Sequence, residues 1–341
     1  MASLGSVFDR DILLRTINAN PERLTPFWTS GAFNTSGQIG QLIAGGSPTF
    51  EVPYIMDIDG DLEANYSNEI YTDIAMPREI EAGIMQGRMA YLNEHFIEAR
   101  LTKALAAGER ALPLIAQQVD GLWAQQFENR AVATVIGIRN ADQAGSKELE
   151  INIATGTSPT DANRFNVDAF IDVESTMLAG QRGTGAIVVH PKVKAAMRKA
   201  QMLIPFTDPA NLRQVDTYNG RVVVESEKGT LVPGTANTAR YVSYFLNADS
   251  FVAESVRGER DMTYSATELT GNGAGHELLH TRRNVLIHPQ GFSFVADPST
   301  LTGGTKNQAL FASWSDLTTA ANWDMVLDAK QVPFRYLVTN I

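Results

Sequence analysis

The segment His276-Glu277-Leu-Leu-His280 is the strongest candidate for chemistry in this chain of 341 residues. On a helix, histidines four residues apart share a face and can bind zinc, with the glutamate as a general base. A zinc hydrolase of this kind needs a helix and a third ligand. However, the segment follows Gly271-Asn-Gly-Ala-Gly275 and leads into the β-favouring Asn284-Val-Leu-Ile-His288, and no glutamate occurs after Glu277. We therefore expect a strand or loop here, and a zinc hydrolase is only a distant alternative.

The acidic segment Asp57-Ile-Asp59-Gly-Asp61 is a second candidate, because oxygen ligands at alternate positions are typical of calcium loops. Such a loop has glycine at its sixth position and a bidentate glutamate at its twelfth. Leu62 and Asn68 occupy those positions here. An acidic turn is the better interpretation, and no metal ligand is predicted.

The glycine-rich segments do not form a nucleotide site. Gly303-Gly-Thr-Lys306 lacks the opening glycine of a phosphate-binding loop. Gly271-Asn-Gly-Ala-Gly275 has His276 where a dinucleotide fingerprint needs its third glycine. None of the five histidines has an obvious serine or aspartate partner in the sequence. We therefore predict no catalytic residue and no cofactor, so the chain is not expected to be an enzyme.

Composition narrows the class of protein further. The formal net charge is −10, whereas a protein that grips nucleic acid normally presents a basic surface. The charge argues against DNA binding but not against enclosing DNA. The absence of cysteine excludes disulfides, thiolate zinc sites and cysteine nucleophiles. Without an apolar run of about 20 residues or a signal-like N-terminus, neither a membrane span nor secretion is expected.

The acidic residues are concentrated in one part of the chain. Between Phe50 and Ala82 there are nine acidic residues and one basic residue, and the first lysine is Lys103. This segment is either a solvated surface excursion or an acidic arm that docks on a basic patch of a neighbouring subunit. The candidates for such a subunit contact are Asp57, Asp59, Asp61, Glu63 and Arg78.

One long amphipathic helix is predicted over about 113–139. Its apolar residues recur every three or four positions and are Ile115, Val119, Leu122, Trp123, Phe127, Ala131, Val135 and Ile138. Pro113 suits a first turn, while Gly137 and Asn140 favour an end. A helix of this length has to support something extended, and we predict that Trp123 and Phe127 are core residues rather than a ligand site.

The remaining pattern predicts an α+β chain. Helices are expected over 9–17, 88–107, 167–178 and 191–202. A long two-stranded excursion is expected over 49–74, with its strands at 50–56 and 69–74. Further strands are expected at 186–190, 221–224, 241–246, 250–253, 284–288, 291–295 and 335–341.

Taken in order, these segments resemble the major capsid proteins of tailed bacteriophages with the HK97 fold. The similarity covers roughly residues 92 to 341. It is carried by the order and spacing of Ile115–Ala131, Phe165–Asp172, Ile187–Ala200, Arg221–Glu225, Tyr241–Leu246, Arg283–Phe294 and Trp323–Asn340.

The resemblance implies an HK97-like α+β fold with four parts. Residues 1–27 would be an N-terminal arm, and 49–90 an extended β-hairpin loop that overlaps the next subunit. Residues 187–275 would be an axial domain that packs around fivefold and sixfold axes. A peripheral domain, with the long helix as its spine, would comprise residues 28–48, 91–186 and 276–341.

The resemblance also implies a structural function. Copies of the chain would assemble as pentamers and hexamers into an icosahedral virion shell around double-stranded DNA, in the host cytoplasm and without sequence-specific binding. A portal and a decoration protein are implied partners, and the short arm favours a separate scaffolding protein. The extended loop has no lysine, so the crosslink to asparagine found in some relatives is not expected. An encapsulin-like bacterial compartment of the same fold is the nearer alternative.

Overall fold

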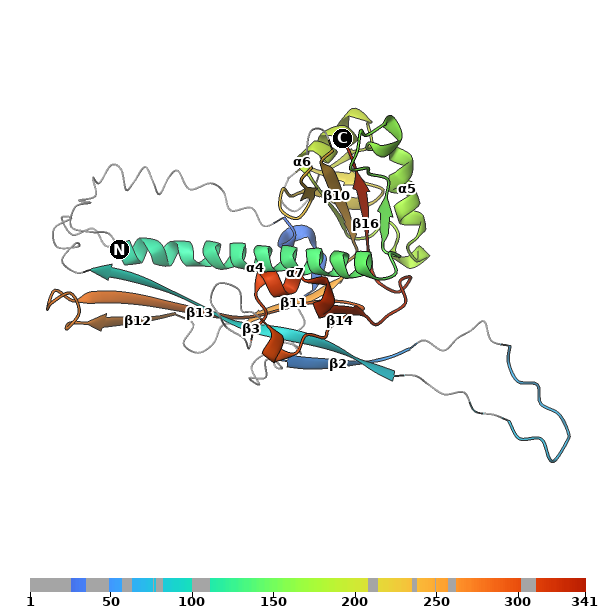
Figure 1. Ribbon diagram of the computed structural model, residues 1–341, viewed down its shortest axis with the longest axis horizontal. Helices are drawn as coiled ribbons and strands as arrows, with labels where there is room; N and C mark the ends of the chain where they lie inside the picture. The colour runs from blue at the N-terminus through green and yellow to red at the C-terminus, as the bar shows by residue number, and fades with distance from the viewer. Residues whose placement is uncertain are drawn as a thin grey trace.

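The computed structural model describes residues 26–34, 49–56, 63–75, 77, 82–99, 111–207, 214–234, 238–248, 250–256, 262–301 and 311–341. Over these ranges the chain forms one long helix between two β-sheets, with a loop that projects far from both (Figure 1). None of the helices in these ranges is both long and apolar enough to cross a membrane. The helix expected over 9–17 lies outside the described residues.

The long helix, α4, spans Ala111–Ala144 and confirms the helix predicted over 113–139. Its 34 residues, at 1.5 Å each, extend over about 50 Å. Both residues predicted to end it lie inside it. A short helix, α7 (Trp314–Thr318), passes so close to Gly137 that an added Cβ would lie 1.8 Å from the Leu317 carbonyl oxygen. Glycine at this position therefore permits close packing and does not mark the helix end.

The middle of α4 is enclosed on all sides. Trp123 and Phe127 are buried as predicted, and the indole N–H of Trp123 donates to Thr281 Oγ1 at 2.9 Å. Every residue from 130 to 135 is also buried. The prediction of a single apolar face is therefore wrong for this part of the helix, because the two sheets cover it from opposite sides.

The first sheet lies beneath α4 and has the strand order β1-β11-β13-β3-β2, with β12 also paired to β13. Its strands are β1 (Phe33–Asn34), β2 (Thr49–Ile55), β3 (Ala82–Ala99), β11 (Phe251–Val256), β12 (Met262–Thr267) and β13 (His276–Pro289). β3 and β13 are long antiparallel partners, while β11 and β12 follow each other along the other edge of β13. We refer to this sheet as the long sheet.

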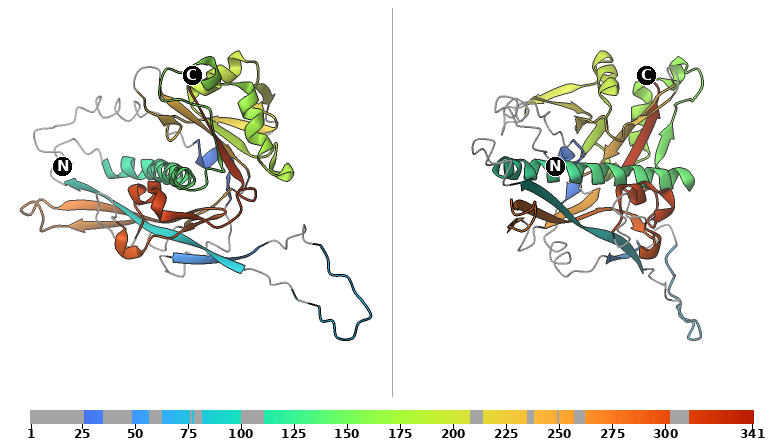
Figure 2. Two further views of the ribbon diagram at one scale, coloured as in Figure 1. Left: turned by 45° about the vertical axis from the view of Figure 1, so that its right-hand side comes forward. Right: turned by 60° about the vertical axis from the view of Figure 1, so that its left-hand side comes forward.

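The second sheet has eight strands in the order β4-β16-β10-β5-β8-β7-β6, with β9 paired to β10. Its strands are β4 (Glu150–Asn152), β5 (Ala186–Val189), β6 (Ile204–Thr207), β7 (Gln214–Tyr218), β8 (Arg221–Glu225), β9 (Leu231–Val232), β10 (Arg240–Leu246) and β16 (Phe334–Thr339). Two helices, α5 (Val167–Ser175) and α6 (Pro191–Lys199), cover one face (Figure 2).

Alternation along β10 explains how the eight-stranded sheet is buried on both faces. Val242 and Tyr244 belong to the main core shared with α4, whereas Tyr241 and Phe245 pack with Phe170 of α5 in a second core. Successive side chains of a strand point to opposite faces, so one apolar strand serves both cores. The strands predicted at 186–190 and 241–246 are confirmed on this basis.

Short elements complete the described fold. A two-stranded sheet pairs β14 (Phe292–Phe294) with β15 (Trp323–Met325). The 3₁₀ turns are η1 (Trp28–Ser30), η2 (Asp161–Asn163), η3 (Ala179–Gln181), η4 (Pro298–Thr300) and η6 (Ala320–Asn322). The helices predicted over 167–178 and 191–202 are confirmed as α5 and α6, each ending a few residues early.

The helix predicted over 88–107 is wrong for residues 88–99, which belong to β3 (Ala82–Ala99), and its remaining residues lie outside the described ranges. The prediction relied on four-residue spacings such as that between Leu92 and Phe96. Four is also a multiple of the two-residue period of a strand, and both side chains pack against the main core from one face of β3. Pairing with β13 along most of its length decides the strand.

Strands within one predicted domain belong to different sheets more often than the predicted domain boundaries imply. Within 187–275, β11 and β12 belong to the long sheet, while the other described strands, β5 to β10, belong to the eight-stranded sheet. Within 276–341, β13 lies in the long sheet, but β16 lies between β4 and β10. The division into an axial and a peripheral domain remains a prediction, and strands from each predicted segment contribute to both sheets.

Replacing Gly137 by alanine tests the close contact between α4 and α7. Alanine favours a helix by about 1 kcal/mol over glycine, so an uncrowded site would be stabilised. Here the added methyl group overlaps a backbone carbonyl, and we expect a net loss of about 2 kcal/mol in the free energy of unfolding, measured by urea denaturation. Gly156→Ala, where a Cβ meets nothing within 4 Å, is the control and should change stability little.

Candidate functional site

The projecting loop begins at a short antiparallel ladder. β2 pairs with the first residues of β3, from Thr49 opposite Arg88 to Ile55 opposite Ala82. The strand predicted at 50–56 is therefore confirmed, but its predicted partner at 69–74 is wrong. The first part of β3 provides the partner because its glycines leave room for the aromatic rings of β2.

Both glycines of β3, Gly83 and Gly87, lie directly against aromatic rings. A Cβ on Gly83 would lie 2.4 Å from the ring of Tyr54, and one on Gly87 would lie 2.1 Å from that of Phe50. The aromatic rings thus cover the bare backbone of the neighbouring strand. The ladder fixes the direction in which the loop leaves the body of the protein (Figure 1).

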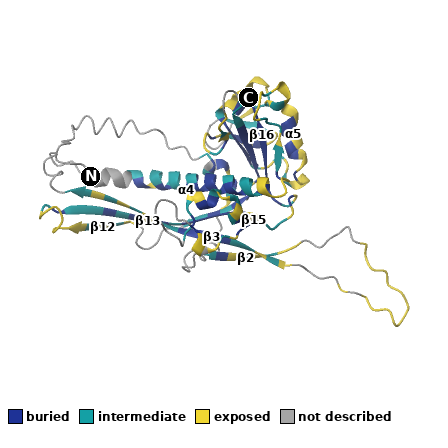
Figure 3. Cartoon of the chain, in the orientation of Figure 1, coloured by how far each residue is buried: buried dark blue, intermediate teal, exposed yellow. Residues whose placement is uncertain are grey.

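Beyond the ladder, residues 63–75 carry apolar side chains that the rest of the described chain does not cover (Figure 3). The exposed fractions are 76% for Tyr66, 58% for Ile70, 101% for Tyr71 and 89% for Ile74. Single exposed apolar residues are normal, but several in one short projecting segment indicate a surface that contacts another molecule.

The same segment is acidic. Glu63, Glu69 and Asp73 are exposed, and no lysine or arginine lies between residues 63 and 75. The Tyr66 hydroxyl donates to Glu63 Oε1 at 2.7 Å, and this hydrogen bond raises the pKa of the tyrosine. Among the five predicted contact residues, the structure places only Glu63.

The other four predicted contact residues, Asp57, Asp59, Asp61 and Arg78, lie outside the described residues. Their role in subunit contact therefore stays a prediction. The acidic character of the segment can be read from the sequence, whereas the exposure of its apolar residues becomes visible only in the structure.

A small buried cluster supports the base of the loop. It contains Phe50, Met89 and Leu286, and the imidazole of His288 lies edge-on to Phe50 with 5.4 Å between ring centroids. Burial lowers the pKa of His288 to about 4. Arg88 is buried beside β2, and desolvation lowers the pKa of its guanidinium, partly offset by the charge of Asp297.

The described N-terminal residues are anchored on α4. The carboxylate of the buried Glu128 accepts hydrogen bonds from the backbone N–H groups of Phe27 at 3.0 Å and Trp28 at 2.9 Å. Burial raises the pKa of Glu128, and these two hydrogen bonds oppose the shift. The ring of Trp28 also lies against Phe127 and stacks on Phe33. The helix therefore fixes the position of Phe27 and Trp28.

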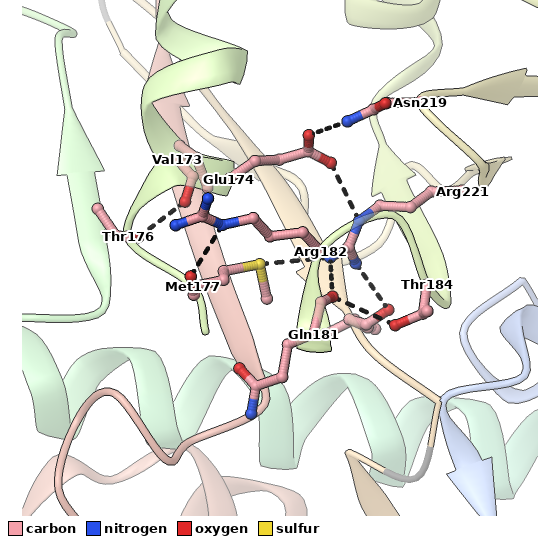
Figure 4. Close-up of polar contacts among 10 residues, drawn as sticks. Val173, Glu174, Thr176, Met177, Gln181, Arg182, Thr184, Asn219 and Arg221 are labelled. Atoms are coloured by element: carbon pink, nitrogen blue, oxygen red, sulfur yellow. Dashed lines mark hydrogen bonds and ion pairs between the residues drawn. The ribbon is translucent and has the colours of Figure 1, made fainter. Parts of the chain in front are cut away.

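A buried ion pair holds the segment after α5 to the eight-stranded sheet (Figure 4). Arg221 Nε donates to Glu174 Oε1 at 3.2 Å, and the same guanidinium donates to the Gln181 carbonyl oxygen at 2.8 Å. Asn219 donates to the other oxygen of Glu174. Both members of the ion pair, Arg221 and Glu174, are buried, so their contact fastens α5 to the eight-stranded sheet.

The zinc motif is not formed. His276 and His280 lie on β13, where residues four apart are separated by about 13 Å, so both cannot coordinate one ion. The His276 Nδ1 lies 2.7 Å from Thr270 Oγ1, whereas His280 meets His95 of β3. No group of three or more His, Cys, Asp or Glu residues within the described ranges could hold a metal ion. The strand geometry thus contradicts the zinc-hydrolase alternative.

The long helix, the two sheets it joins and the projecting loop define an HK97-like capsid fold. No protein-family model matches the chain. The major capsid protein of Bacillus phage SPP1 is 25% identical over 316 residues, which cover 91% of this chain and 89% of that protein. The predicted resemblance to phage major capsid proteins is therefore confirmed.

The solved capsid of a cyanophage agrees with this assignment of the fold. The cyanophage Pam1 capsid protein aligns with a TM-score of 0.51 and 10% identity, over 79% of this chain and 87% of that chain. The SrpI encapsulin of Synechococcus elongatus aligns at 0.46 and 9% identity, over 97% of this chain and 95% of that chain. Together with the SPP1 relative, the fold supports a structural capsid role.

The lowered pKa of the buried His288 predicts that the free energy of unfolding depends on pH. Its folded pKa of about 4 lies below the ordinary value of 6.5, so the unfolded chain binds a proton more readily between these values. This stability is complete above pH 6.5 and is lost as pH falls toward 4, by roughly 2–3 kcal/mol at pH 4.5.

Urea denaturation of unassembled subunits at pH 7 and 4.5 measures this loss. His288→Leu, which fills the site without titrating, should lose roughly 2–3 kcal/mol less than the wild type between the two pH values. His276→Gln, at a partly exposed histidine, should retain most of the wild-type pH dependence. An unchanged pH dependence in His288→Leu would show that this imidazole is not the titrating group.

Proposed function

We propose that copies of this chain assemble, as pentamers and hexamers, into an icosahedral phage shell that encloses packaged double-stranded DNA. The observation that carries the proposal is the acidic loop of residues 63–75, whose tyrosines and isoleucines are exposed on the single chain. Such a loop gains stability only when another molecule covers it, and a shell supplies an identical neighbour at every position.

The proposed mechanism of assembly is the burial of this loop on a neighbouring subunit. Burying one large apolar side chain contributes about 1.5–3 kcal/mol, so a few of them per subunit form only a modest contact. In a closed shell, each subunit buries its own loop on one neighbour and is contacted by the loop of another. The contacts are then made together, and multivalency makes the assembled shell far more stable than a single pair.

The acidic character of the chain supports enclosure of DNA rather than sequence-specific binding. A net charge of −10 does not favour tight contacts with phosphates. We also propose, from the resemblance to phage capsid proteins, assembly in the host cytoplasm with a portal and a separate scaffolding protein. A decoration protein on the outside of the shell belongs to the same proposal.

Electron microscopy of the purified full-length chain, with and without a co-expressed scaffold, tests the proposed assembly. Closed shells are the expected result. Extracting nucleic acid and protein from shells made during infection then distinguishes a DNA container from an enzyme compartment. Subunits that stay monomeric under every assembly condition would contradict the proposal.

A double substitution in the loop tests the proposed contact directly. Tyr71→Ser with Ile74→Ser removes two exposed apolar side chains and should leave the melting temperature of free subunits nearly unchanged. Shell yield, measured by sedimentation and microscopy, should fall at least about tenfold, since roughly 3 kcal/mol of burial per subunit is lost. Tyr71→Phe with Ile74→Val keeps the apolar surface and should assemble normally. Equal yields from both variants would exclude this loop as a main contact.

A further inference from the structure

A pair of histidines joins the two longest strands of the structure. His95 of β3 and His280 of β13 are direct cross-strand partners, and their Nδ1 atoms lie 2.8 Å apart. The ring centroids are 4.8 Å apart and the rings are inclined at 73°. His95 is exposed and His280 is partly buried, so solvent and dissolved ions reach the pair.

Ser265 orients one member of the pair. Its Oγ on β12 lies 2.8 Å from Nε2 of His280. When this hydroxyl accepts the Nε2–H, the lone pair of His280 is on Nδ1 and faces His95. The Nδ1–H of His95 then donates to that lone pair. A ligand histidine of a metal site is held in the same way, through a hydrogen bond on its other nitrogen.

We propose that His95 and His280 bind a divalent transition-metal ion through their two Nδ1 atoms. Metal–nitrogen bonds to histidine are about 2.0 Å long, and two such bonds at a right angle place the nitrogens about 2.8 Å apart. The observed separation equals this value. The strands therefore hold the two nitrogens at the distance that adjacent positions of a tetragonal ion require.

The chemistry of the pair selects the kind of ion. Imidazole ligands suit Cu²⁺, Ni²⁺ and Zn²⁺, and the right-angle arrangement favours Cu²⁺ and Ni²⁺ over tetrahedral Zn²⁺. The neighbouring positions on this face of β3 and β13 are Asn93, Ile97, Leu278 and Arg282. None of them is a carboxylate, so water completes the coordination, and Ca²⁺ and Mg²⁺ are not bound.

Binding requires the shift of one proton and a rotation of the two imidazole rings. His280 already presents its Nδ1 lone pair, while His95 shifts its proton from Nδ1 to the other ring nitrogen. Rotation of the two rings turns both Nδ1 lone pairs toward the ion, which then lies about 1.4 Å from the line between the nitrogens and links β3 to β13. Acid competes with the metal, because a protonated imidazole has no lone pair.

Isothermal titration of the untagged full-length protein with NiCl₂ tests the site. We expect one Ni²⁺ per chain at pH 7.5 and much weaker binding at pH 5. His95→Gln and His280→Gln should each weaken binding at least about tenfold. Electron paramagnetic resonance of the Cu²⁺ form should show two equatorial nitrogen ligands in the wild type and one in either variant.

His276→Gln is the matched control, because His276 lies on the same strand and the same face but opposite Ala99. It should bind Ni²⁺ like the wild type. His95 is exposed, so its variant remains informative even if His280→Gln folds poorly, and circular dichroism checks the fold of each. The proposal is overturned if the wild type binds no Ni²⁺, or if His276→Gln weakens binding as much as His95→Gln does.

Discussion

The enclosure of α4 between two sheets is the constraint on which the rest of the structure depends. A surface helix has one apolar face, but residues 130–135 of this helix are buried all round. Polar groups there need partners inside the protein. The guanidinium of Arg130 donates to the Ala312 carbonyl oxygen at 2.9 Å, and Thr134 Oγ1 donates to the Arg130 carbonyl oxygen. The helix is thus committed to both sheets and cannot detach from one without exposing core.

Polar contacts near the end of α4 connect it to the eight-stranded sheet. Arg139 donates to the Tyr244 hydroxyl at 3.2 Å, and the Tyr336 hydroxyl contacts the carboxylate of Asp142. Burial and that carboxylate raise the pKa of Tyr336 well above its usual range. These bonds, together with the Glu128 contacts to the N-terminal segment, hold that segment and both sheets in fixed positions relative to α4. The loop ladder is positioned by the long sheet that the helix covers.

The local sequence pattern was sufficient to predict an element whose apolar residues repeat with a single period. The 3.6-residue period predicted α4, and short apolar runs predicted β5 and β10. Local pattern failed where a distant partner decides the outcome. Residues 82–99 form a strand because β13 and β2 pair with them, and Gly137 stays helical because α7 crosses there. The meeting of His95 with His280 depends on strand register across 185 residues of sequence, which no local spacing records.

The composition of the projecting loop also has a consequence for subunits that have not yet assembled. Exposed Tyr71 and Ile74 would favour random association of free chains, yet Glu69 and Asp73 flank them on the same segment. Like charges repel when two such loops approach each other, so the acids act as gatekeepers against loop-to-loop aggregation. In the proposed shell, the loop therefore contacts a different surface of another subunit. A contact between unlike surfaces repeats from one subunit to the next. It ends only when the series of contacts closes on itself.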